Sequence, residues 1–147
     1  MTTLKSMTTT SNPTGATALN PKLSGEGLAL TCARSAIDKK GENLKILNVS
    51  KLSGFTDYFV IANGQSDRQV TAIADSIVEN LAREGVHPLS MEGNGDGRWV
   101  LIDFGDVVVH VFLDALREYY DLERLWSEAP KVQIPAEFYG PAGSRLN

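Results

Sequence analysis

The stretch "RWVLIDFGDVVVHVF", residues 98–112, carries the strongest strand signal in the chain. Two runs rich in β-branched and aromatic residues lie on either side of Gly105-Asp106. A glycine-containing pair between two such runs is typical of the tight turn of a β-hairpin. The sequence therefore predicts two antiparallel strands joined at this turn.

The same stretch holds two carboxylates, Asp103 and Asp106, which raise the question of catalysis. Asp103-Phe104-Gly105 matches the magnesium-binding tripeptide of protein kinases, but the other kinase motifs are missing from the sequence. Two-metal phosphoryl transfer needs carboxylates that converge on one side of a strand. A spacing of three places these two on opposite faces, with a turn between them. Neither residue is expected to be catalytic.

His110 lies between valines near the end of the second predicted strand. This setting favours a buried or interface histidine, hydrogen-bonded to a carboxylate or to the backbone, over a general base. Asp106 and Asp57 are the candidate partners. We therefore expect structural roles for His110 and Asp57.

Helices and further strands are predicted on both sides of the hairpin. Ser66 and Gln69 form a capping box, in which each side chain satisfies a backbone amide of the first turn, and an apolar stripe runs from there to Leu81. The remaining elements are a helix from the Ser24 cap to about Lys40, strands over 44–52, 57–64 and 87–93, and a helix from an Asp114 cap to about Ser127. This order predicts an α/β fold, a mixed β-sheet flanked by helices.

Composition limits the functions that remain. The chain has 147 residues, 18 acidic against 14 Lys and Arg, and a net charge of −4, so a domain coating nucleic-acid phosphates is not expected. A basic protein partner suits this charge. One cysteine permits neither an internal disulfide nor a cysteine-based zinc site, and no apolar run reaches the length of a membrane span. We expect no cofactor, no membrane contact and a cytoplasmic location, with an organelle stroma or matrix as the alternative.

One domain is predicted over residues 24–128. Residues 1–23 are rich in Thr and Ser, and residues 129–147 contain prolines and glycines without periodicity. Both compositions offer little apolar surface to offset the entropy of ordering. We expect a disordered N-terminal tail and an extended or disordered C-terminal tail.

The last predicted helix, "LDALREYYDLERLW", combines aromatic and acidic residues. Leu116, Tyr119 and Leu122 are spaced to face the core, whereas Tyr120 is rotated by about 100° from Tyr119. Tyr120 and Trp99 are then either core residues at its edge or anchors of a protein interface.

Four stretches together resemble the ribosomal silencing factor family, also called the Iojap family. They are "TDYFVIANGQSDRQVTAIAD" (56–75), "GVHPLSMEG" (85–93), "WVLIDFGDVVVHVF" (99–112) and "YDLERLW" (120–126). The resemblance covers about residues 24–128. It implies a nucleotidyltransferase-like scaffold without the catalytic carboxylates, and a protein that is not an enzyme.

The resemblance also implies a partner and a mechanism. Members bind ribosomal protein L-fourteen on the large ribosomal subunit, block joining of the small subunit and repress translation; organelle relatives assist large-subunit assembly. Members also form homodimers. Carried over by position, the aromatic contacts to the partner fall on Trp99 and Tyr120. Further candidate contacts are Asp103, Asp106, Glu123 and Trp126.

Two alternatives remain open on the sequence. One is an adaptor for assembly of the large subunit. The other is a divergent nucleotidyltransferase-type enzyme or hydrolase using Asp103, Asp106 and His110, which predicts binding of divalent metal.

Overall fold

A computed structural model describes residues 24–140 and contains one six-stranded sheet in the order β4-β5-β6-β3-β2-β7. The elements are α1 (Gly25–Asp38), β2 (Glu42–Asn48), β3 (Tyr58–Gly64), α2 (Asp67–Arg83), β4 (Ser90–Glu92), β5 (Trp99–Asp103), β6 (Val107–Leu113), α3 (Asp114–Tyr120), α4 (Leu122–Leu125), β7 (Lys131–Val132) and the 3-10 helix η2 (Ala136–Tyr139). β3 and β6 are parallel, and the other neighbouring strands are antiparallel. The predicted mixed sheet flanked by helices is confirmed.

The predicted hairpin is formed by β5 and β6. The Phe104 N–H donates to the Val107 carbonyl at 2.9 Å, which closes the turn over Gly105-Asp106. Gly105 has a φ of +93°, a region that residues with a side chain rarely adopt. The Gly-Asp pair thus provides the backbone conformation that this turn requires.

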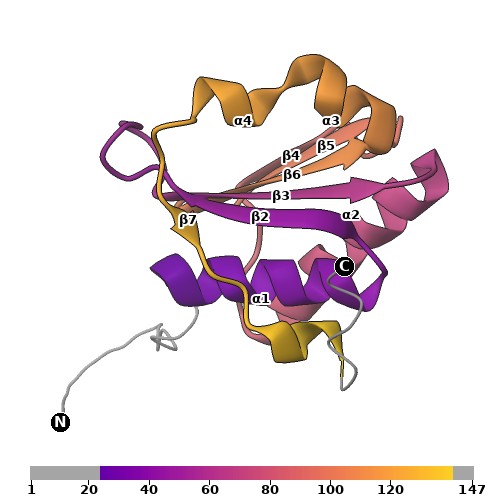
Figure 1. The fold of residues 1–147 in the computed structure, drawn as a ribbon. Coiled ribbons are helices and arrows are strands. Elements are labelled where there is room, and N and C mark those ends of the chain that lie inside the picture. Colours follow the sequence, from indigo (N-terminus) through magenta and orange to yellow (C-terminus); the bar gives the residue numbers. More distant parts are fainter. Residues whose placement is uncertain (1–23, 141–147) are drawn as a thin grey trace, which may run out of the picture.

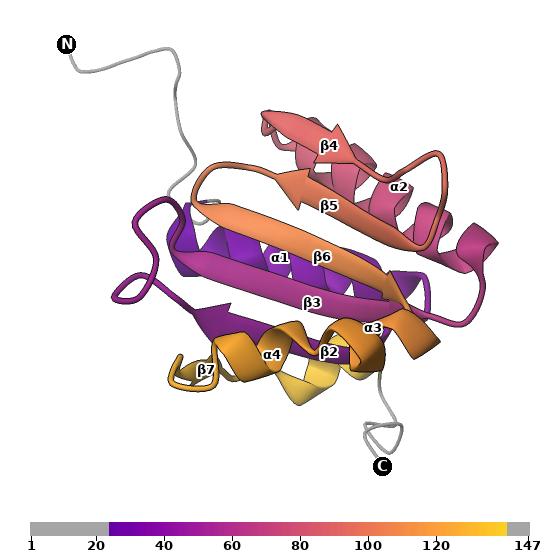
Figure 2. The same cartoon turned by 90° about the horizontal axis from the view of Figure 1, so that it is seen from above.

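The sheet separates two apolar layers. In Figure 1, α1 and α2 lie on one side of it and α3 and α4 on the other. Side chains alternate between the faces of a strand, so β6 contributes Val107, Val109 and Val111 to the layer under α1 and α2, and Val108, His110 and Phe112 to the layer under α3 and α4. Figure 2 looks down on the second layer, where α3 and α4 run along β2 and β3 and leave β4 and β5 without a helix above them.

The start of α2 differs from a reciprocal capping box. Ser66 Oγ accepts from the Gln69 N–H at 3.1 Å, as predicted. The Gln69 side chain, however, accepts from the Gln65 N–H and donates to the carbonyls of Lys39 and Lys40, just after α1. Gln69 therefore connects the start of α2 to the end of α1, a contact that only the folded chain creates.

The single last helix expected from Asp114 to Ser127 is wrong. Asp121 adopts a left-handed conformation (φ 48°, ψ 50°), which separates α3 from α4. Asp114 is not the cap but the first residue of α3, and its carboxylate accepts from Asn63 Nδ2 at 2.7 Å. Tyr119, expected in the core, is 78% exposed, because the buried side of α3 carries Arg117 instead.

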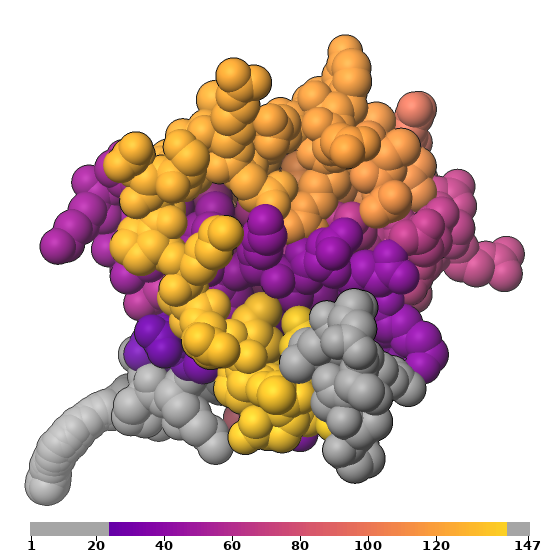
Figure 3. All heavy atoms as spheres, in the orientation of Figure 1, coloured from indigo at the N-terminus to yellow at the C-terminus, as the bar shows by residue number. Residues whose placement is uncertain are grey.

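Residues 129–140, predicted as part of an extended or disordered tail, pack against the sheet. β7 pairs with β2, and Ala129 is buried in the layer under α4. Figure 3 shows this C-terminal segment running down across the β2 edge toward the side that carries α1. There the guanidinium of Arg34 lies 5.4 Å from the centre of the Phe138 ring. The predicted N-terminal tail, 1–23, and the last part of the predicted C-terminal tail, 141–147, lie outside the described residues.

The glycine-rich loop before β5 supplies a test of the backbone at Trp99. Gly93 has a φ of +83°, and a Cβ there would lie 2.0 Å from the Trp99 carbonyl oxygen. We expect Gly93→Ala to lower the free energy of unfolding by about 2–4 kcal/mol, because it adds backbone strain to a steric clash. Urea unfolding measures this change.

Gly95 provides the matched control in the same loop. A Cβ at Gly95 would meet nothing within 4 Å. We expect Gly95→Ala to change the free energy of unfolding by no more than about 0.5 kcal/mol. Equal effects of the two substitutions would contradict the tight approach of Gly93 to Trp99.

Candidate functional site

A row of aromatic rings runs through the layer under α3 and α4. Trp126 meets Phe59 edge to face at 5.0 Å between ring centres, and Phe59 meets His110 in the same way at 5.1 Å. Trp99 lies 6.0 Å from His110 and 4.7 Å from Tyr120. The row therefore links the buried centre of the sheet to the surface at Tyr120.

His110 holds the Trp99 indole in place. Trp99 Nε1–H donates to His110 Nδ1 at 3.2 Å. The sequence suggested Asp106 or Asp57 as the partner of His110, but the partner is Trp99. β5 and β6 pair with Trp99 opposite Phe112, which makes His110 the diagonal neighbour of Trp99. Aromatic side chains reach across such diagonals, and this is why the contact depends on strand register.

The charge state of His110 follows from this contact. An acceptor Nδ1 requires the neutral ring, with its proton on Nε2. Burial lowers the pKa of His110 to about 4, because the charged imidazolium is poorly solvated there. Nε2 is buried without a hydrogen-bond partner among the described residues. Both ring nitrogens of His110 are thus enclosed by the protein.

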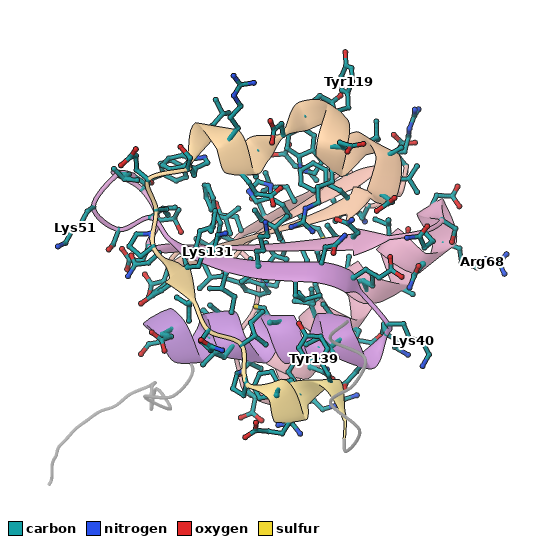
Figure 4. The ribbon with its side chains drawn as sticks, in the orientation of Figure 1. Lys40, Lys51, Arg68, Tyr119, Lys131 and Tyr139 are labelled. Carbon is teal, nitrogen blue, oxygen red and sulfur yellow. The ribbon has the colours of Figure 1, made fainter. Side chains whose placement is uncertain are left out.

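Trp99, Tyr119 and Tyr120 form the aromatic patch. Tyr120 is 48% exposed while its ring rests on Trp99, and Tyr119 meets Tyr120 edge to face at 5.1 Å. Figure 4 shows Tyr119 pointing outward, away from the sheet. The structure thus brings together the predicted pair Trp99 and Tyr120 and adds Tyr119, which sequence periodicity had placed in the core.

The predicted acidic residues of the hairpin lie at the turn, and their backbone contacts are structural. Asp103 shares a sheet face with Trp99 but lies at the other end of β5, where its carboxylate accepts from the Gly105 N–H at 2.8 Å. The exposed Asp106 accepts through its carbonyl from the amides of Asp57 and Tyr58. Asp57 therefore supports the fold through its backbone.

Glu123 and Trp126 are the two candidates on and after α4. The Glu123 carboxylate contacts Arg117 at 3.1 Å and Lys45 at 3.0 Å. Burial raises the pKa of Glu123, but hydrogen bonds from Arg117 and Lys45 outweigh it and leave the pKa below its ordinary value. Trp126 packs its ring against Phe59. Both residues thus make contacts that shape the α3–α4 layer.

The described residues contain no candidate metal centre. Residues 24–140 contain no group of three or more His, Cys, Asp or Glu side chains placed to hold a metal ion. A cleft of about 330 Å³ between α3 and β2 is lined by polar side chains, among them Asn43, Lys45 and Glu118. The same part of the chain has no helix long and apolar enough to cross a membrane.

An exposed aromatic surface on a rigid sheet is suited to binding another macromolecule.

Comparison with known proteins agrees with this class. The family model described as ribosomal silencing factor during starvation matches residues 22–144. The ribosomal silencing factor of Bacillus subtilis is 46% identical over 102 residues, which are 69% of this chain and 86% of that protein. The chain belongs to the ribosomal silencing factor family.

Two further similarities concern an organelle protein and a solved structure. The mouse protein named mitochondrial assembly of ribosomal large subunit protein 1 is 32% identical over 106 residues, covering 67% of this chain and 46% of that protein. A crystal structure from Bacillus halodurans matches with a TM-score of 0.67 at 40% identity, covering 75% of this chain and all of that one. The fold of this chain therefore agrees with that of a solved structure of similar sequence.

Burial of neutral His110 predicts that stability depends on pH. Its pKa is about 4 in the folded chain against 6.5 ordinarily, so only the unfolded chain takes up the proton between these values. Stability should therefore fall as the pH drops from 6.5 to 4, by about 3 kcal/mol from this residue. Urea unfolding across this range measures the loss.

His110→Gln provides the comparison for this pH profile, because glutamine does not titrate. The stability difference between the wild type and His110→Gln should shrink as the pH falls from 6.5 to 4. Parallel profiles would contradict a neutral, buried His110.

Proposed function

We propose that this protein binds the large ribosomal subunit through ribosomal protein L-fourteen and prevents the small subunit from joining. It represses translation in this way and catalyses no reaction. Membership of the ribosomal silencing factor family supports the role, since relatives are named as silencing factors. The exposed aromatic patch is the proposed binding site on the molecule.

The observation that carries the proposal is the contact between Trp99 and Tyr120. The Trp99 indole is hydrogen-bonded to the buried His110, and the Tyr120 ring packs against Trp99 while remaining 48% exposed. An aromatic anchor held rigidly in place loses little conformational entropy on binding, and aromatic residues dominate the energies of protein interfaces. Trp99 and Tyr120 are therefore the proposed central contacts.

Charge and size fit the same partner. The net charge of −4 favours association with a basic protein. The exposed Glu118 and Asp121 lie directly before Tyr119 and directly after Tyr120 in the sequence. Asp103, Asp106 and Trp126 are proposed as peripheral contacts. A stable interface buries about 1,600 Å² in total, enough for a small domain to occupy a surface needed by another subunit.

The proposal extends to location and assembly. We place the protein in the cytoplasm and propose that it forms a homodimer. We also propose that the dimer uses the aromatic patch, so that dimerisation and ribosome binding compete. A complex containing both the dimer and the ribosomal protein, detected by native mass spectrometry, would contradict this competition.

Co-sedimentation with isolated ribosomal subunits tests the function. The protein should sediment with the large subunit and not with the small one, and added protein should lower the fraction of joined ribosomes. Trp99→Ala and Tyr120→Ala should each weaken binding by about thirtyfold or more, as expected for central aromatic anchors.

Tyr139→Ala is the matched control for these substitutions. Tyr139 lies beside α1 in Figure 4, on the side of the sheet opposite the aromatic patch. Its variant should bind like the wild type once circular dichroism shows that each variant is folded. Absence of binding to the large subunit would refute the proposed function, and full binding by Tyr120→Ala would refute the proposed site.

Large-subunit assembly is the second candidate, because the name of the mouse relative describes such a role for that protein. The same aromatic patch would then hold an immature subunit. If the protein is a silencing factor, we expect it to bind mature large subunits at least as tightly as assembly intermediates. Binding to intermediates alone, in sedimentation of fractionated particles, would favour the assembly role instead.

A further inference from the structure

Arg117 is the buried residue of α3, although it is a cation. Only 6% of its surface is exposed. Nε and Nη2 donate to the two carboxylate oxygens of Glu123 at 3.2 and 3.1 Å, and Nη1 donates to Asn63 Oδ1 at 2.7 Å and to the Asn43 carbonyl. Its side chain therefore joins α3 to α4, β3 and the start of β2.

The partners of Arg117 are themselves held in place. Asn63 is buried at the end of β3, where its Nδ2 also donates to the Asp114 carboxylate of α3. Lys45 of β2 contacts Glu123 from the other side at 3.0 Å. Arg117 and Glu123 are thus both bonded to strands of the sheet, and these bonds fix α3 to the sheet.

This attachment matters because the two helices are too short to stand alone. α3 has 7 residues and α4 has 4, whereas isolated helices shorter than about 12 residues are marginal in water. The left-handed Asp121 between them adds backbone strain, since a residue with a side chain there is disfavoured. The fork between Arg117 and Glu123 spans this break and holds α4 against α3.

Helix geometry connects Arg117 to the aromatic patch. Successive residues turn by about 100°, so Tyr119 lies about 160° from Arg117, almost opposite to it, whereas Tyr120 lies only about 60° from Arg117. Fixing Arg117 toward the sheet therefore turns Tyr119 outward and lays Tyr120 on Trp99. The observed exposures, 78% for Tyr119 and 48% for Tyr120, agree with this rotation.

We propose that Arg117 is a positioning residue for the partner-binding surface: its bonds to Glu123, Asn63 and Asn43 set the rotation of α3 and thereby place Tyr120 on Trp99. Glu123 belongs to this device through its bonds to Arg117 and Lys45. The inference rests on the proposed function for its effect on ribosome binding. Its effect on the aromatic patch is independent of that function.

Arg117→Lys tests the proposal, because lysine keeps the charge and loses the planar two-pronged donor. Arg124→Lys is the matched control, since Arg124 is exposed on α4. The first readout is the nuclear magnetic resonance signal of the Trp99 indole N–H, identified by its absence in Trp99→Phe. In Arg117→Lys this signal should move toward its position in Tyr120→Ala, and in Arg124→Lys it should stay in place.

The second readout is a double-mutant cycle on large-subunit affinity. Arg117→Lys should weaken binding about tenfold in the wild type and less than about twofold in Tyr120→Ala, because the lost contact is then already absent. A role in general stability alone would weaken both backgrounds equally. Measurement at a temperature where circular dichroism shows every variant folded keeps unfolding out of the comparison.

Glu123→Gln provides a second route if Arg117→Lys does not fold, because glutamine has the same shape and lacks the charge that pairs with Arg117. It should move the Trp99 signal in the same direction. A stationary signal in the folded variant, or equal losses of affinity in both backgrounds, overturns the positioning role. Absence of ribosome binding by the wild type refutes the proposed function, while the Trp99 signal still decides the role of Arg117.

Discussion

The register of β6 against its two neighbours is the constraint on which the rest of the structure depends. β6 pairs with β3 in parallel and with β5 in antiparallel register, and its alternate residues supply both apolar layers. A shift by one residue would exchange the faces, placing His110 under α1 and α2 and removing it from Trp99. The tight turn at Gly105 sets this register for β5, and the buried valines hold it.

The two faces of the sheet are stabilised by different means. The layer under α1 and α2 is mostly apolar, and α2 alone contributes buried residues from Val70 to Leu81. The buried polar groups between the two helices are Ser35 and Ser76, which are joined by a hydrogen bond. The opposite face combines aromatic rings with a polar cluster around Arg117. A fully paired polar cluster specifies one arrangement of the elements it joins, since breaking any bond leaves a buried charge unsatisfied. Apolar packing thus supplies much of the stability, and the opposite face supplies a defined surface.

Residues that look catalytic in the sequence make internal contacts in the folded chain. His110 is kept neutral by burial and accepts the Trp99 indole proton, and the Asp103 carboxylate accepts from the backbone of the turn. The contact of His110 supports the aromatic patch, and that of Asp103 supports the turn at the other end of β5. On the same face of the sheet, no helix lies above β4 and β5 (Figure 2).

Trp99 and Tyr120 were singled out by the resemblance to the silencing factor family, whereas local patterns in the sequence were sufficient for the mixed sheet, the hairpin and α2. These features depend on turn chemistry, on periodicity and on motifs that extend over a few residues. Periodicity failed at α3, where it placed Tyr119 in the core and continued the helix through Asp121. The missing information was the contact of Arg117 with Asn43 and Asn63, residues 74 and 54 positions away in the chain. Because the buried Arg117 also needs partners that distant segments bring to it, the orientation of the last helices was decided by the tertiary structure.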